Sequence, residues 1–279
     1  MVFVLLWSTG FIAAHYATRD AAPLTFLAVR LGAAGALLAI IATVLRVPRP
    51  RLAEARWLMV SGIGMHAIYL GGVFIAIHLG MPSGVGAVIA GLHPVVTAFL
   101  GRSLLDERLA RVQWLGIFLG LAGVIVVVLE KVLAHSSGVA AGALLASSLS
   151  VLGMSGGTLV QRRHGASVPL LWGTVAQYAA STVVLAVAGV VFEDFRISFT
   201  ASTVFALVWS TLVLSIGAVL IMLWLLQHQA AAKVSSLFFL TPALSALEGA
   251  ILFHEHLGVL AFVGFGVAVT GVALVTRAS

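Results

Sequence analysis

The feature that most constrains this chain is a series of apolar stretches, each about twenty residues long, separated by short polar gaps. A helix needs roughly 20 apolar residues to cross the hydrocarbon core of a bilayer. Backbone groups inside lipid must bond within the protein, so stretches of this length predict membrane-spanning helices. The chain divides into ten such spans, at 2–18, 23–45, 57–77, 82–104, 112–130, 138–160, 168–191, 200–226, 231–253 and 258–276.

The composition supports a membrane protein and excludes several other classes. Of 279 residues, 61% are hydrophobic and only 9% are charged, which is far from the composition of a soluble domain. The net charge of +6 comes from Arg residues in short gaps, without a basic run interleaved with aromatics, so the expected partner is the lipid bilayer and not nucleic acid. The absence of cysteine excludes a disulfide framework and thiolate chemistry.

The distribution of basic residues predicts the orientation of the chain. With the N-terminus in the cytoplasm, eleven of the Lys and Arg residues fall in cytoplasmic gaps or the tail and three in outer gaps. Positive residues favour the cytoplasmic side, so we expect both termini there. The first span begins at once, and we expect it to act as the membrane signal in place of a cleavable peptide.

The sequence also contains an internal repeat. Pro94 and Pro242, like Glu107 and Glu255, are 148 residues apart, and other residues match at the same separation. The repeat predicts two halves of five spans each, at 1–131 and 138–279. Because five is odd, the halves must cross the membrane in opposite senses. Inverted repeats are typical of alternating-access transporters, which bind substrate near the midplane.

Three sequence features together resemble a known family. They are "WSTGF" at 7–11, Arg30 in the second span, and the repeated Pro, Glu-x-Leu and Gly-rich final span. The chain resembles the EamA branch of the drug/metabolite transporter superfamily over essentially its whole length. This resemblance implies two EamA repeats in the bacterial inner membrane, and similarity to amino-acid exporters that move aromatic and other large side chains. Trp7 and Arg30 have no counterpart of the same residue type in the second half, which sets those two residues apart.

Polar and small residues recur at helical spacing in several spans, which predicts a central cavity. A cavity lining and ordinary helix packing by small residues both fit such stripes. We expect the polar members to orient the charged backbone of the substrate and the aromatic members to hold its side chain. The candidate substrate-binding residues are Trp7, Arg30, Tyr69, His93, Gln177, Tyr178, Phe238 and Glu248.

Two of these candidates are ionisable groups inside predicted spans. A charge at the bilayer centre costs about 2.5–3.5 kcal/mol on insertion scales, so Glu248 and Arg30 are expected to face protein or water. Glu248 can accept a proton or bind the ammonium of a substrate, or it can be hydrogen-bonded locally. Arg30 can bind substrate or extend toward the interface.

The repeated residues fall into two groups. Pro94 and Pro242 are expected to remove an intrahelical bond near mid-span, freeing a carbonyl around residues 90 and 238, and so to form gates or static bends. Glu107 and Glu255 follow their spans and are expected to orient backbone amides at a helix–loop junction. Repetition in both halves favours architecture over substrate recognition for these acids.

Several short motifs lack the spacing or context that their chemistry requires. The "HEH" at 254–256 lacks the i, i+4 spacing of a zinc-binding HExxH, so we expect no metal site. The sequence has no nucleotide-binding motif, and we expect neither a cofactor nor enzyme activity. An intramembrane enzyme acting on lipid would have only His15 and Asp20 as candidates. Within the transporter class, a different metabolite, a drug cation or a nucleotide derivative stays open as substrate, as do proton coupling and a monomeric or homodimeric state.

Overall fold

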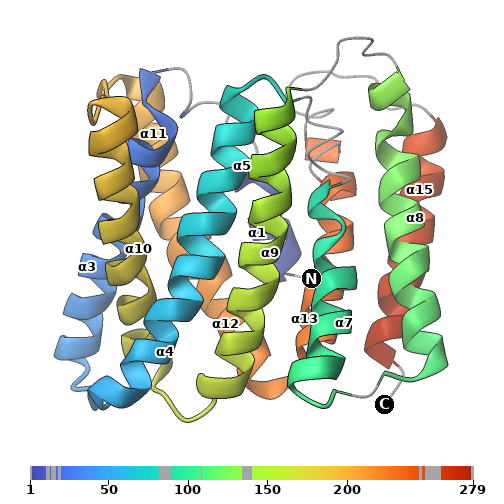
Figure 1. The fold of residues 1–279 in the computed structure, drawn as a ribbon, viewed down its shortest axis with the longest axis horizontal. Helices are drawn as coiled ribbons and strands as arrows, with labels where there is room; N and C mark the ends of the chain where they lie inside the picture. Colours follow the sequence, from blue (N-terminus) through green and yellow to red (C-terminus); the bar gives the residue numbers. More distant parts are fainter. Residues whose placement is uncertain are drawn as a thin grey trace.

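The computed structural model describes residues 2–10, 13, 17, 20–81, 89–107, 109–133, 140–244, 247–248 and 259–277. Nearly all of these residues are helical, and the helices stand side by side in an elongated bundle (Figure 1). In the described ranges, the one β-type pairing is an isolated bridge between Ala21 and Ile197. The all-helical class predicted from the sequence is confirmed for this part of the chain.

The helices follow the predicted spans closely. They are α1 (Val2–Ser8), α3 (Pro23–Val44), α4 (Leu52–Gly62), η1 (Ile63–Ile68), α5 (Tyr69–His78), α7 (His93–Leu104), α8 (Arg111–Leu133), α9 (Ala141–His164), α10 (Leu170–Glu193), α11 (Ala201–Trp209), η2 (Ser210–Ala218), α12 (Val219–His228), α13 (Ala231–Ser236), η3 (Leu237–Leu240) and α15 (Val259–Arg277). Pro23 is the first residue of α3, and Pro169 directly precedes α10. Proline lacks a backbone N–H, which the first turn of a helix does not need.

Five helices of the described chain are long and apolar enough to cross a membrane. They are Pro23–Val44, Leu52–His78, Ala141–His164, Leu170–Glu193 and Ala201–His228. Shorter apolar helices occupy Arg111–Val126, Ala231–Leu244 and Phe262–Arg277. Predicted spans one, four, six, nine and ten include residues outside the described ranges, so the count of ten spans and the orientation of the termini stay predictions.

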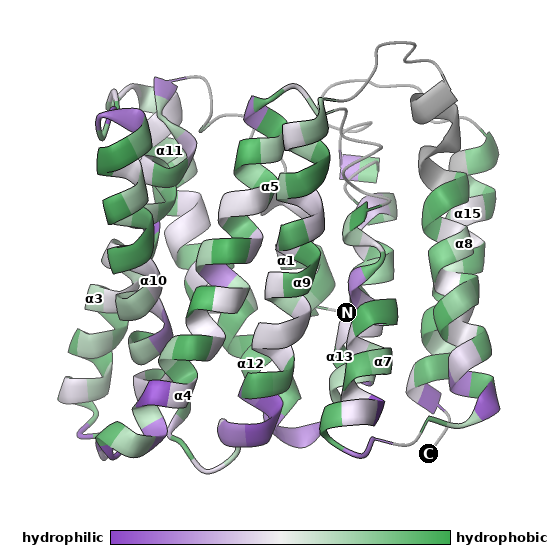
Figure 2. Ribbon diagram, viewed as in Figure 1, coloured by the Kyte–Doolittle hydropathy of each residue, from purple (hydrophilic) through white to green (hydrophobic). Residues whose placement is uncertain are grey.

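Apolar residues predominate along the helices, and many of the strongly hydrophilic residues are at the lower ends of the bundle (Figure 2). On α10, Val183, Val187 and Val191 are 64%, 59% and 64% exposed and recur every fourth residue, so they form one outward face. The opposite face of α10 buries Gln177 and Ser181. An apolar outside with a polar inside is the arrangement that lipid favours and water disfavours.

The two halves of the sequence are in extensive contact. Helix α3 packs along α10, helix α8 packs along α15, and the helix from Leu52 to His78 packs against α9. At one end of the bundle α8 and α15 lie side by side (Figure 1). A Cβ added at Gly123 would lie 2.5 Å from the backbone nitrogen of Ala268, so the close approach of these two helices requires glycine.

Two long helices contain a π-helical segment that the sequence did not reveal. One is η1, within the helix Leu52–His78, and the other is η2, within the helix Ala201–His228. Residues 63–68 of η1 correspond to 211–216 at the separation of 148 residues, and η2 covers that range. π-Helical segments are rare and frequently mark functional sites. Both halves therefore carry the same backbone irregularity at the same place.

The expected role of the repeated prolines is corrected by the structure. Pro94 lies in the first turn of α7, after a two-residue turn at 91–92, and not inside a continuous helix. Pro242 follows η3, where the Thr241 N–H donates to the Phe238 carbonyl. The carbonyl of residue 238 is thus bonded and not freed, because the tighter 3₁₀ turn supplies a donor three residues later. Pro94 thus follows a turn at the start of a helix, whereas Pro242 follows a 3₁₀ segment within the helix Ala231–Leu244.

Candidate functional site

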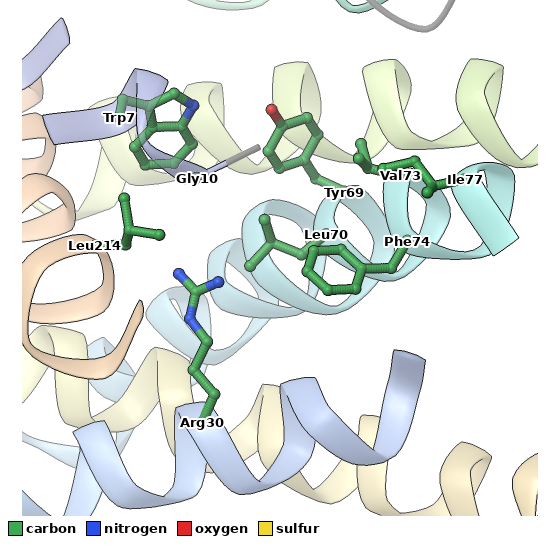
Figure 3. Close-up of a pocket in the computed structure, with 9 residues that line it drawn as sticks. All are labelled: Trp7, Gly10, Arg30, Tyr69, Leu70, Val73, Phe74, Ile77 and Leu214. Atoms are coloured by element: carbon green, nitrogen blue, oxygen red, sulfur yellow. The ribbon is translucent and has the colours of Figure 1, made fainter. Parts of the chain in front are cut away.

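A cavity of about 50 Å³ opens between helices of both halves. Its walls come from α1, α3, the helix Leu52–His78 and η2 (Figure 3). The lining is mainly apolar, with one guanidinium and one phenol, which is typical of small-molecule sites. The lining residues are Trp7, Gly10, Arg30, Tyr69, Leu70, Val73, Phe74, Ile77 and Leu214.

Arg30 is the cationic group of this cavity and is only 6% exposed. Its Nε donates to the Ser215 hydroxyl at 2.8 Å, and the Tyr178 hydroxyl donates to the Ser215 carbonyl. The two terminal nitrogens of Arg30 point away from α3 and lie between Leu70 and Leu214 (Figure 3). Among the described residues, no hydrogen bond to these two nitrogens is found. The guanidinium is therefore held by one edge and presents the rest to the cavity, in a geometry suited to a carboxylate.

A second cavity of about 30 Å³ adjoins the first, and Trp7 and Tyr69 line both. The Trp7 indole N–H interacts with the Tyr69 hydroxyl, and Figure 3 shows these two groups turned toward each other. The pair forms a partition between the two cavities. The second cavity is lined by Trp7, Tyr69, Ala90, Gly91, His93, Phe238, Thr241 and Pro242.

The second cavity lies between matching residues of the two halves. Ala90 and His93 are 148 residues before Phe238 and Thr241, and all four line the cavity. The turn before Pro94 and the 3₁₀ segment before Pro242 thus meet at this place. A site on the repeat axis is where inverted-repeat transporters bind substrate.

Aromatic rings and unpaired polar atoms surround this second cavity. The ring of Phe238 is 5.2 Å from Trp7 and 5.1 Å from His93, in edge-to-face contacts. The Nδ1 of His93 lies 3.0 Å from the hydroxyl oxygen of Ser155. In the described part of the chain, His93 Nε2 and Thr241 Oγ1 have no hydrogen-bond partner. A ligand or water can satisfy these two buried atoms.

Gln177 and Tyr178, both predicted to bind substrate, are fully buried among helices and line neither cavity. Gln177 Oε1 is 3.1 Å from His66 Nε2, and its Nε2 donates to Gln161 Oε1 at 2.7 Å. Tyr178 bonds to Ser215, as described above. These contacts join α10 to η1, α9 and η2, and Tyr178 shares Ser215 with Arg30.

Glu248 lies near α1 and belongs to neither cavity lining. The Ser8 hydroxyl donates to Glu248 Oε1 at 2.5 Å, linking the second half to the first helix. Its other oxygen, Oε2, is buried and has no hydrogen-bond partner within the described ranges. The carboxyl is thus held one residue from Trp7 and keeps an acceptor available.

Glu107 has a structural position at a helix start. Its Oε1 accepts from the Ala231 N–H at 3.0 Å and lies 3.8 Å from Arg162 Nε. The carboxylate therefore ties the end of α7 to the first residue of α13 in the other half. Glu255 and the "HEH" sequence lie outside the described residues, so the structure does not compare the two repeated acids.

Sequence reasoning missed three polar residues that organise the site. Ser215 fixes Arg30, Gln161 bonds Gln177, and Ser155 bonds His93. All three are small or polar residues in otherwise apolar helices. Their polarity was the only signal in the sequence that could have indicated a role. Their partners lie 16 to 185 residues away in the sequence, so the sequence does not reveal the pairs.

Comparison with known proteins identifies the family. A model of the EamA-like transporter family matches residues 1–129 and 140–277. The chain belongs to this family. It is 29% identical over 280 residues to the uncharacterized transporter YvbV of Bacillus subtilis, covering 99% of this chain and 90% of that protein. It is 26% identical over 275 residues to the uncharacterized inner membrane transporter YedA of Escherichia coli K12, covering 98% and 87%.

A solved structure has the same fold as this EamA-like chain. This crystal structure superposes on the present chain with a TM-score of 0.79 at 22% sequence identity, and the match covers 98% of this chain and 94% of the other. The family resemblance drawn from the sequence is thereby confirmed, and the chain is a membrane transporter by family. The substrate and the transport mechanism are finer questions that these relatives leave open.

Proposed function

We propose that this chain exports amino acids with aromatic or other large side chains across the bacterial inner membrane by alternating access. The observation that carries the proposal is the buried Arg30 guanidinium, fixed by Ser215 and facing a cavity that aromatic side chains share. A buried cation held in one orientation favours an anionic group such as a substrate carboxylate. Trp7, Tyr69 and Phe238 supply aromatic surface for the substrate side chain.

The cavities indicate that binding needs a conformational change. Volumes of about 50 and 30 Å³ hold a few water molecules and not a large amino acid. The Trp7–Tyr69 partition stands between the two cavities, so its opening would join them. In the proposed mechanism the two inverted halves rock against each other, and this movement opens the site to one side of the membrane at a time.

The proposed membrane arrangement completes this mechanism. Ten spans with both termini in the cytoplasm form repeats 1–131 and 138–279. The Arg-rich gaps then face the cytoplasm, as the positive-inside bias favours. Pro94, after a turn, and Pro242, after a 3₁₀ segment, are beside the second cavity, which supports a role for both as gates.

A second candidate function has one observation in its favour. Glu248 keeps a buried oxygen without a partner among the described residues, next to α1. A carboxylate in such a place can bind a cationic drug. Glu248→Gln separates the two functions, because loss of cation flux with retained amino-acid flux supports the cation exporter. The same variant tests whether Glu248 binds the ammonium of an amino acid.

The direct experiment is a panel of labelled solutes in proteoliposomes, with and without a pH gradient. We expect efflux of aromatic amino acids from vesicles containing the protein and none from empty vesicles. A dependence of the rate on the pH gradient would assign proton coupling. Movement of another solute class with no amino-acid flux would overturn the substrate and leave the transporter fold in place.

A further inference from the structure

A groove away from the central cavities combines an apolar wall with an arginine. It has a volume of about 370 Å³ and lies between the end of α3 and the start of α10. Its size falls within the range of about 300–1,000 Å³ found for ligand sites. The lining residues are Ala39, Ile40, Thr43, Val44, Arg49 and Trp172.

The end of α3 builds one side of the groove. After Leu45 the chain turns back, with the Val47 N–H donating to the Ala42 carbonyl and the Arg46 N–H to the Thr43 carbonyl. This pair of bonds is a Schellman motif, and it requires the left-handed φ of 53° at Arg46. The turn brings Val47 over the first turn of α10.

Trp172 fixes the other side of the groove. Its indole N–H donates to the Val47 carbonyl at 2.9 Å. The Arg49 guanidinium carbon lies 5.0 Å from the centre of the Trp172 ring, a cation–π distance. Because the ring covers one face of the guanidinium, the edges of Arg49 remain available for hydrogen bonds. Arg49 is exposed, and it forms no ion pair with any described residue.

The surroundings identify the chemistry of the occupant. Along α3 the groove continues into exposed Ile40 and Val44, which are 61% and 75% exposed. At its polar end, Arg46 and Arg51 flank Arg49 on the same loop. An acyl chain fits the apolar side and a phosphate fits the arginine end, which is the pattern of basic pockets that hold anionic lipid head groups.

We propose that this groove is a specific site for one anionic phospholipid. The phosphate binds the edge of Arg49 above the Trp172 ring, and an acyl chain lies along Ile40 and Val44. Since α3 belongs to the first half and α10 to the second, the bound lipid touches both halves. The site stands on different residues from the central cavities and does not depend on the transported solute.

The experiment measures lipid binding to the purified protein in detergent. Phosphatidylglycerol and phosphatidylcholine with identical acyl chains are titrated, and bound lipid is counted by native mass spectrometry together with the thermal unfolding midpoint. We expect one phosphatidylglycerol to bind in preference and to raise the midpoint. Equal binding of both lipids, or an equal shift with inorganic phosphate alone, would overturn the proposal.

Two variants and a matched control locate the site. Arg49→Gln should weaken phosphatidylglycerol binding about fivefold, the effect of one interfacial arginine. Val44→Trp fills the groove and leaves every charge in place, so it should also reduce binding. Arg56→Gln is the control, because Arg56 lies 5.5 Å over the ring of Trp57 without belonging to the groove lining.

The binding results for the three variants support or contradict the proposed lipid site. Reduced binding in both groove variants with normal binding in Arg56→Gln supports the site. Equal losses in Arg49→Gln and Arg56→Gln indicate attraction to general positive charge and contradict it. Unchanged binding in Val44→Trp contradicts the placement of the acyl chain. The unfolding midpoint without lipid shows whether any variant has lost its fold.

Discussion

The helices that contain η1 and η2 occupy matching places in the two halves, yet they contribute differently to the centre of the protein. His66 of η1 is buried and bonds Gln177, whereas Leu214 of η2, 148 residues later, is an apolar wall of the first cavity. Ser215 of η2 fixes Arg30, while its counterpart Ala67 has no polar side chain. The π-helical backbone is repeated in the two halves, but the side chains at matching positions are not.

This difference separates architecture from recognition. The π-helical segments are present in both halves, and Pro94 and Pro242 follow a local irregularity in each half. Arg30 and Trp7 are present in one half only, and the proposed function assigns substrate selectivity to them. Mutations in the two classes should therefore fail in different ways.

The largest effect is expected for Arg30→Gln, which removes the charge found in one half only. Loss of a buried charge partner costs about 2–5 kcal/mol, so transport of a carboxylate-bearing substrate should fall at least about thirtyfold at low substrate concentration. Flux into proteoliposomes measures the effect. Arg163→Gln serves as the control, because Arg163 is an exposed arginine that bonds only the Leu104 carbonyl among described residues. Equal loss in both variants would remove the special role of Arg30.

The next largest effect compares matching positions at the start of the π-helical segments. A Cβ at Gly62 would lie 2.4 Å from the Gln177 Cα, so Gly62→Ala forces two backbones apart and should destabilise by about 1–3 kcal/mol. Ser210, its counterpart 148 residues later, is buried with a hydroxyl that donates to Leu207, and Ser210→Ala should cost about 1 kcal/mol or less. Thermal unfolding in detergent checks the order. The reverse order would contradict the close approach of α4 and α10.

The sequence predicted the helices well and the site only partly. Span limits followed from apolar length and from Pro23 and Pro169, which mark helix starts through local chemistry. The sequence predicts that Gln177 and Tyr178 bind substrate; the structure buries both between helices and outside the two cavity linings, so their role stays a prediction. A polar residue in a membrane helix fits both a cavity lining and a helix contact, since it can face water or bond a neighbouring helix.

The π-helical segments contain two residues whose side-chain contacts at the site were not predicted from the sequence. π-Helical segments are rare, and a sequence-based prediction assumes the ordinary α-helical period through them. His66, which contacts Gln177, and Ser215, which bonds Arg30, both lie in these segments. These pairs are 111 and 185 residues apart, so only the folded chain reveals them.

A smaller effect is expected at the second cavity. Phe238→Ala removes a ring that, in the proposed function, contacts the aromatic side chain of the substrate, a contact worth about 0.5–1.5 kcal/mol. Affinity for aromatic substrates should therefore fall about two- to tenfold, while smaller amino acids are affected less. Competition assays with a labelled substrate give the ratio. The counterpart Ala90 already lacks a ring, so Ala90→Ser is a mild control. An equal loss for all substrates would contradict the role of the ring.

The smallest effect concerns the repeated acids. Glu107→Gln weakens the bond to the Ala231 N–H and the attraction to Arg162, and should cost about 1 kcal/mol. If Glu255 has the matching role that the repeat predicts, Glu255→Gln should lower the unfolding midpoint by a similar amount. Both variants should keep substrate affinity. A selective loss of affinity in one of them would place that acid among the recognition residues.

The central claim is that Arg30 recognises a carboxylate, and the most direct measurement uses two solutes that differ in that group. Efflux of an aromatic amino acid and of its decarboxylated amine is compared in proteoliposomes with wild-type protein and Arg30→Gln. We expect wild-type protein to move the amino acid and discriminate against the amine, and Arg30→Gln to lose this preference. Equal transport of both solutes by wild-type protein, or unchanged preference in Arg30→Gln, would contradict the account.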